Sequence, residues 1–362
     1  MLQKEAQISH DALWHNLKFF KKSLENKSIV ACVKANAYGH GFYEVMPVLA
    51  NADACYVHSW DAAIRLRRDY PNLRIVLAGF IGNEITIKHL VSENIDWVIF
   101  CEHQIELLKS ANYEGSSINV WLKLDTGMNR LGFAEDAAHK ALYLLEQSPF
   151  VRNIILMTHL ACGTNPEHEA SKKQMAAFER FTNLYPYFET SVGATALTLS
   201  KELPLGDWVR IGGGMYGLSP FPEQTAQELG LQPVMRLHAK IISVKSCSAG
   251  EFIGYDATWQ VKSATRIAVI AIGYGDGYLR SIKSGNPVYI NGGFAKVVGR
   301  ISMDTVVVEL PDDLLVTVGD WAELWGANMP IEHVAKSAGT ISYELATTVG
   351  RRVKRTIVRN IN

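Results

Sequence analysis

Residues 29–33 read IVACV, an apolar, β-branched run that ends on Lys34 and passes directly into KANAYGHG (34–41). Such a run is typical of a buried strand. Seven more runs follow, at 54–58, 74–79, 96–100, 119–125, 154–160, 190–194 and 208–213. Segments of helical periodicity lie between them, at 59–69, 84–92, 102–110, 135–146 and 167–184. The alternation predicts a parallel sheet closed into a (β/α)8 barrel, and the GxGxxG loop of an open dinucleotide-binding sheet is absent after the first run.

The pattern changes after residue 230. VMRLHAKIISV (234–244) alternates apolar and polar residues with period two, and VYINGGFAKVV (288–298) contains an Asn-Gly hairpin signal. Residues 234–362 therefore predict an antiparallel β domain with a helical insertion near 331–338. The junction falls in the Pro- and Gln-containing segment 219–233. We expect a cofactor-binding barrel of residues 1–225 and a β domain of residues 226–362.

Composition excludes several classes of function. Thirty-six basic and 36 acidic residues cancel without long runs of one sign, so we expect neither a nucleic-acid nor a membrane partner. The five cysteines form no CxxC pair, and the first residues lack the features of a secretory leader. We therefore expect a cytoplasmic protein.

Reactive side chains follow the predicted strands, and active sites of parallel barrels lie at these strand ends. Lys34 follows the first strand, and Arg130, His159, Thr195 and Arg210 follow later ones. No acidic pair or metal-ligand cluster accompanies them. A desolvated lysine near cations readily forms a Schiff base, and RIGGGMYG (210–217) offers backbone amides for a phosphate. This combination predicts pyridoxal 5'-phosphate as the cofactor.

Eight motifs occur in the order found in alanine racemases, the fold type III enzymes that depend on pyridoxal phosphate, and the resemblance covers essentially the whole chain. The motifs are VKANAYGHG (33–41), LKLDTGMNRLGF (122–133), THLA (158–161), DWVRIGGGMYG (207–217), GYDATW (254–259), GYGDGYLR (273–280), GRISMDTVVVEL (299–310) and ISYELATTVGRRV (341–353). The resemblance implies an isomerase (EC 5.1.1.1) that interconverts L- and D-alanine and supplies D-alanine for peptidoglycan.

The resemblance also implies roles for the matching residues. Lys34 would carry the cofactor, and Arg210 would face its pyridine nitrogen and keep that nitrogen unprotonated. The phosphate would be held by Tyr38, Thr195, the amides of Gly212 and Gly213, and Tyr343. The substrate carboxylate would be bound by Arg130 with the amide of Met303. Lys123 matches a position that is carbamylated in some family members, and the sequence leaves its modification open.

Inversion at one carbon requires a second base, because a base that returns its proton to the same face restores the starting enantiomer. By the resemblance, this base is Tyr255 from the neighbouring subunit, hydrogen-bonded to His159, which contacts Arg210. The enzyme would then be a homodimer with shared sites. Tyr255 and Tyr343 would form a narrow inner entrance, which favours small substrates. The outer entrance residues would be Tyr274, Arg280, Arg300 and Ile341.

Simpler interpretations exist for single residues, and one family position differs. His159 alone is typical of a satisfied core histidine, and a zinc site at His159, Cys162 and His168 lacks further ligands. Most family members carry Asn-Ser where this chain has Ala194 and Thr195; threonine keeps a hydroxyl for the phosphate, but an amide is lost.

Three alternatives remain at this level. A racemase of broader specificity, accepting serine, lysine or arginine, would use the same scaffold, as would a fold-related amino-acid decarboxylase. A non-catalytic pyridoxal phosphate carrier would consist of the barrel alone, so residues 234–362 argue against it.

Overall fold

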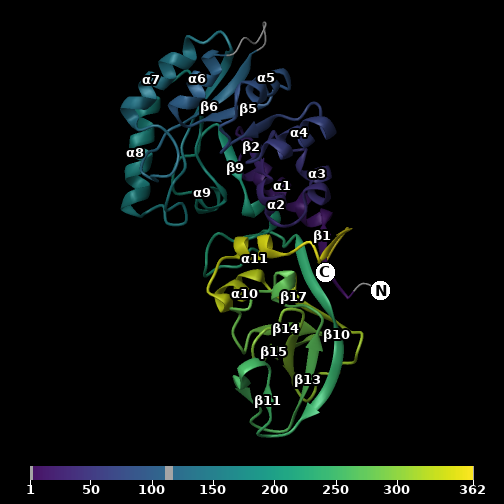
Figure 1. Cartoon of the computed structure of the whole chain (residues 1–362). Helices are drawn as coiled ribbons and strands as arrows, with labels where there is room; N and C mark the ends of the chain where they lie inside the picture. Colours follow the sequence, from purple (N-terminus) through teal and green to yellow (C-terminus); the bar gives the residue numbers. More distant parts are fainter. Residues whose placement is uncertain (1–2, 111–116, 362) are drawn as a thin grey trace. The chain divides into compact units, whose positions relative to one another are not determined.

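The computed structural model describes residues 3–110 and 117–361. Eight parallel strands pair in the order β8-β7-β6-β5-β4-β3-β2-β9, and a parallel bridge between Ala194 and Arg210 joins the two ends. The sheet is therefore closed, and the predicted (β/α)8 barrel is confirmed (Figure 1). Its strands are β2 (Ser28–Cys32), β3 (Ala54–Val57), β4 (Ile75–Leu77), β5 (Asp96–Ile99), β6 (Ile118–Lys123), β7 (Val151–Met157), β8 (Glu189–Ser191) and β9 (Trp208–Ile211).

Helices cover the outside of this sheet (Figure 1). The five predicted helices are confirmed as α4 (Trp60–Asp69), α5 (Glu84–Ser92), α6 (Glu102–Ser110), α7 (Glu135–Glu146) and α8 (Glu169–Asn183). The short α9 (Thr195–Ser200) was not predicted. Both faces of the strands are buried, because the helices cover one face and side chains inside the barrel fill the other. This burial explains why the strands are continuous apolar runs.

The predicted antiparallel β domain is also confirmed. Six strands close in the order β10-β13-β16-β15-β14-β17, since β13 also pairs with β10. The domain contains β10 (Met235–Cys247), β11 (Phe252–Ile253), β12 (Trp259–Gln260), β13 (Thr265–Ile270), β14 (Pro287–Ile290), β15 (Gly293–Val297), β16 (Val306–Leu310) and β17 (Trp321–Trp325). The expected insertion is α10 (Ile331–Ala338), followed by α11 (Ser342–Thr348).

A strand from the beginning of the chain extends this second sheet, which the sequence did not predict. Strand β1 (Lys4–Ser9) pairs antiparallel with β10, with Ala6 opposite Leu237, and parallel with β18 (Lys354–Val358). The chain continues into α1 (His10–Ser23) and later into α3 (Phe42–Leu49). The amino-terminal strand is therefore part of the antiparallel β sheet.

Packing divides the chain into two compact units. One contains Met1–Lys18, Ala35–Val48 and Gly213–Asn362, and the other contains Phe19–Lys34 and Leu49–Gly212. The second unit holds all eight barrel strands, and the first holds the antiparallel sheet. A contiguous boundary between residues 225 and 226 stays a prediction. Within the described ranges, no helix combines the length and apolar character that a membrane span requires.

The segment after β2 is a turn of left-handed helix. In α2 (Lys34–Tyr38), the φ angles of Ala35, Asn36 and Ala37 are 51°, 53° and 56°, and φ of Tyr38 is 53°. Each non-glycine residue in this conformation costs about 1–2 kcal/mol. Backbone hydrogen bonds close the turn, including Gly39 N–H to Ala35 O at 3.0 Å.

Gly39 ends the turn where no side chain fits. Its φ is +80°, and a Cβ atom would lie 1.8 Å from the carbonyl oxygen of Ala346. Arg355 Nε also donates to Gly39 O at 2.8 Å. The turn is thus held against α11 by a close backbone approach that only glycine permits.

We expect Gly39→Ala to lower the free energy of unfolding by about 3 kcal/mol, because it adds backbone overlap to conformational strain. Gly285→Ala is the matched control: φ of Gly285 is +93° and its Cβ would meet nothing within 4 Å. The control should lose about 1 kcal/mol, from strain alone. Urea denaturation measures both losses, and equal losses would contradict the role of the close approach.

Candidate active site

Arg210, in β9, is the buried centre of the barrel's reactive end. Its side chain is 5% exposed and donates from Nη1 to Ser191 O at 3.0 Å and Ser191 Oγ at 2.5 Å. Nη2 donates to Thr158 O at 2.7 Å and lies 3.3 Å from His159 Nδ1. These four partners are uncharged, so none of them neutralises the guanidinium. Burial lowers the pKa of Arg210, but an arginine remains charged at neutral pH.

The state of His159 follows from this contact. Arginine has no acceptor, so Nδ1 of His159 must accept and carries no proton. Burial, then the charges of Arg210 and Lys123, lower the pKa of His159 to about 3. The imidazole is therefore neutral at neutral pH, and its single proton is on Nε2. A neutral ring that offers one N–H is suited to stabilise an anionic oxygen.

Lys123 ends β6 and is also buried. Burial, then the charges of Arg130 and Arg210, lower its pKa to about 8. The charge of Lys34 also lowers the pKa of Lys123. A large fraction of this amine is thus neutral near physiological pH, which is unusual for lysine and makes it nucleophilic.

Arg130 lies in an exposed loop that Asp125 organises. One carboxylate oxygen of Asp125 accepts the backbone N–H groups of Gly127, Met128 and Asn129, each at 3.0 Å. The loop returns to the barrel where Phe133 N–H donates to Lys123 O at 2.9 Å. The fold therefore places the Arg130 side chain beside the strand ends that carry Lys123 and His159.

The second compact unit brings together most of the residues predicted from the strand ends. The charges of Lys34, Lys123, Arg130 and Arg210 all act on His159. Thr195, at the start of α9, accepts a hydrogen bond at Oγ1 from Gly212 N–H at 3.3 Å. These residues form a cationic site without a carboxylate pair.

The first compact unit brings together another set. Rings of Tyr38 and Tyr343 meet edge to face with centroids 5.7 Å apart, and Tyr38 stacks on Tyr216 at 5.2 Å. A Cβ on Gly213 would lie 2.2 Å from Cε1 of Tyr343, so the backbone approaches the phenol directly. Phenol hydroxyls and an unobstructed glycine backbone suit a phosphate.

Tyr255 and Met303 lie on the surface of this unit, with 66% and 52% of each residue exposed. Tyr255 begins a short 3-10 turn, and the next residue, Asp256, is paired with Arg300. Tyr274 and Ile341, predicted at the entrance, are exposed at 40% and 62%. An exposed tyrosine of this kind is available to another chain.

Two side chains near the cations were missed. Tyr56 and His58 lie at the end of β3, and burial, then Lys34 and Lys123, lower the pKa of His58 to about 4. Burial raises the pKa of Tyr56 to about 12. The rule of inspecting residues after each strand would have found His58 if it had been applied to the second strand. In the described residues, no group of three or more His, Cys, Asp or Glu could hold a metal.

Family models match both parts of the chain. The alanine racemase N-terminal domain matches residues 8–220, and the C-terminal domain matches residues 234–357. A curated alanine racemase from Shewanella loihica is 39% identical over 96% of this chain and 97% of its own length. A curated alanine racemase from Vibrio vulnificus is 40% identical over 95% of this chain and 96% of its own length.

Solved structures of alanine racemases are also similar to this chain. The biosynthetic alanine racemase from Pseudomonas aeruginosa has a TM-score of 0.93 at 36% identity, with 99% of this chain and 100% of that chain covered. An alanine racemase from Bartonella henselae with covalently bound pyridoxal phosphate has a TM-score of 0.87 at 27% identity, with the same coverage. The chain belongs to the alanine racemase family.

Proposed function

We propose that this protein interconverts L- and D-alanine with pyridoxal phosphate, using two bases. The observation that carries the proposal is the convergence of Lys34, Arg130, His159 and Arg210 on one end of a barrel in a chain that matches both family domains. The match to residues 234–357 also argues against a carrier made of the barrel alone.

The residues fit the cofactor. Lys34 would bind its aldehyde, and the phosphate would contact Thr195, Gly212, Gly213, Tyr38 and Tyr343. The close approach of Gly213 to Tyr343 supports this assignment, because only glycine lets the phenol ring lie directly against this backbone. When bound, the cofactor delocalises the electron pair left on the substrate Cα after deprotonation.

Arg210 would face the pyridine nitrogen. Its guanidinium is held by Ser191 and Thr158 and offers only donors. A group that has only donors cannot accept a hydrogen bond from a protonated ring nitrogen, and its charge opposes protonation there. Arg210 would thus restrain electron withdrawal and limit side reactions such as transamination.

Lys34 and Tyr255 would exchange protons with opposite faces of the substrate Cα. Tyr255 would come from the partner subunit of a homodimer, which its 66% exposure supports. The Nε2–H of His159 would donate to the phenolate oxygen and stabilise it. The substrate carboxylate would be bound by Arg130 and the backbone amide of Met303.

We place the reaction in the cytoplasm, where its D-alanine would supply peptidoglycan synthesis. A tight site with small substrates follows from the proposed entrance of Tyr255 and Tyr343. The alternative, a racemase of broader specificity, is tested by measuring racemisation of other amino acids.

The purified protein should abolish the optical activity of either alanine enantiomer and incorporate deuterium at Cα in heavy water. Borohydride reduction followed by peptide mapping should place the pyridoxyl label on Lys34. Lys34→Ala should reduce kcat about 10³-fold, since it removes one base. A protein that neither racemises alanine nor exchanges its Cα proton would refute the proposed activity, and a panel including serine, lysine and arginine measures specificity.

Lys34→Ala and Tyr255→Phe proteins, each inactive, should complement one another when refolded together. A two-fold symmetric dimer with shared sites has one intact site in each mixed dimer, so an equimolar mixture should reach about one quarter of wild-type activity. Mass spectrometry should verify the mixed dimers. Verified mixed dimers without activity would show that Tyr255 does not act across subunits.

Lys123 should react with carbon dioxide to form a carbamate that neutralises and orients Arg130. The pKa of about 8 makes the neutral amine available, and the neutral fraction rises with pH, reaching about one half at that value. We expect a carbamate signal in ¹³C NMR with labelled bicarbonate that disappears in Lys123→Arg.

The same variant should raise KM for alanine about tenfold, because an uncompensated cation would sit beside Arg130. Lys173 lies on an exposed helix position, so Lys173→Arg is the control. It should change neither the carbamate signal nor the KM for alanine. An unmodified Lys123 at saturating carbon dioxide would contradict this assignment.

A further inference from the structure

His40 is buried directly after the left-handed turn, with 0% of the residue exposed. Its Nδ1 lies 3.0 Å from the carbonyl oxygen of Tyr38. A carbonyl only accepts, so Nδ1 carries the proton. Burial lowers the pKa of His40 to about 4, which leaves a neutral ring with that single proton. Nε2 is therefore a lone-pair acceptor.

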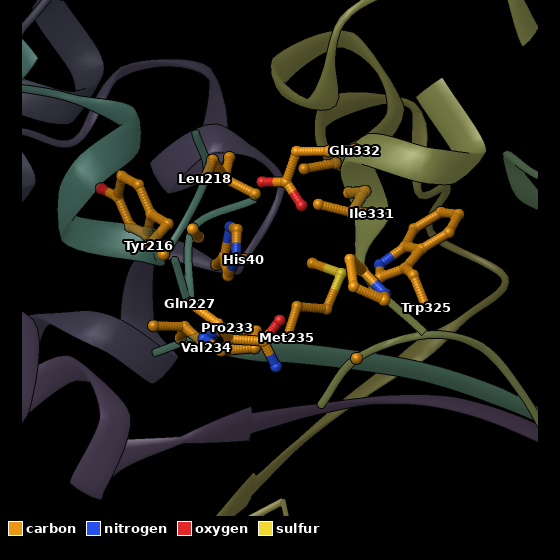
Figure 2. A pocket seen from close by; sticks show the side chains of 15 residues that line it. His40, Tyr216, Leu218, Gln227, Pro233, Val234, Met235, Trp325, Ile331 and Glu332 are labelled. Carbon is orange, nitrogen blue, oxygen red and sulfur yellow. The ribbon is translucent and has the colours of Figure 1, made fainter. Parts of the chain in front are cut away.

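That acceptor has no hydrogen-bond partner within the described chain. The same is true of Nε1 of Trp325, an indole donor on a residue only 1% exposed. His40 and Trp325 line one small cavity, together with Glu332, Met235 and Tyr216. Figure 2 shows His40 and Trp325 on two sides of this space, with the Met235 side chain between them. An unmet acceptor and an unmet donor thus share one void.

The void and its chemistry match a single water molecule. The volume open to the centre of a water-sized sphere is about 10 Å³, close to what one water occupies. A water at this end of the void can donate one proton to His40 Nε2. Its second proton can go to the carboxylate of Glu332, whose Oε1 already accepts from Ser219 N–H at 2.9 Å. Buried polar groups left unmet would each be costly.

We propose that this cavity binds one ordered water that donates to His40 Nε2, and that His40 in the resulting tautomer is a positioning residue for Tyr38. The imidazole also stacks on Tyr216, with centroids 4.7 Å apart, and Tyr216 stacks on Tyr38. Both the carbonyl and the ring of Tyr38 are therefore restrained by the same group. The effect on cofactor binding rests on the proposed function, in which Tyr38 contacts the phosphate.

A crystal structure of the complete holoenzyme, at a resolution that defines ordered waters, tests the cavity. One water peak within hydrogen-bonding distance of His40 Nε2 is expected. An empty cavity, or Nε2 bonded directly to a protein donor, would overturn the proposal.

Two variants test the positioning role. His40→Asn places an amide N–H near the position of Nδ1 and keeps a donor for Tyr38, whereas His40→Gln extends past it and loses that donor. The apoproteins are titrated with pyridoxal phosphate and with pyridoxal, which lacks the phosphate, and cofactor fluorescence reports binding. His40→Gln should raise the Kd for pyridoxal phosphate about 3- to 10-fold, the effect of one hydrogen bond, and leave pyridoxal unchanged.

His40→Asn should keep the Kd for pyridoxal phosphate within about twofold of wild type, since it restores the one hydrogen bond in question. Equal losses in both variants, or equal losses for both ligands, would overturn the positioning role. Wild-type protein that binds the two ligands equally well would instead refute the proposed phosphate site, while the water peak still tests the cavity independently.

Discussion

The uncompensated charge of Arg210 governs the chemistry of the barrel's reactive end. Its donors are directed at Ser191, Thr158 and His159, and none of these carries a negative charge. Burial, together with this charge, lowers the pKa of His159 and of Lys123, so His159 is neutral and Lys123 is easily deprotonated. Near a buried positive charge, a lysine favours its neutral amine and a tyrosine favours its phenolate, compared with the same groups in water. The same charge thus acts on both His159 and Lys123.

The left-handed turn from Ala35 to Tyr38 is the second constraint. Four consecutive non-glycine residues in this conformation are costly, and they persist because surrounding contacts hold each part of the turn. Gly39 packs on the backbone of Ala346, and His40 donates to Tyr38. The strain permits a lysine at a strand end and the tyrosine proposed to bind the phosphate to be separated by only three residues.

Local patterns allowed much of the fold to be predicted. All eight barrel strands and five surrounding helices were recognised because burial on both faces leaves a continuous apolar run that needs no knowledge of distant residues. Strand β1 was missed because its partner, with Ala6 opposite Leu237, lies in the other half of the chain. His58 was missed because the end of the second strand was not inspected, and only the tertiary structure brings Lys34 and Lys123 near it.

The sequence by itself determined the alternation of the eight barrel strands with helices and the family, and it singled out Lys34, Arg130, Arg210 and Tyr255 as the proposed site residues, because these depend on local periodicity and on motifs. Tertiary structure decided which atoms carry protons. His159 has its proton on Nε2 because Arg210 occupies Nδ1, and Lys123 loses its proton readily because burial and two arginines disfavour its charge. Protonation depends on distance and burial in three dimensions, and neither is written in residue order.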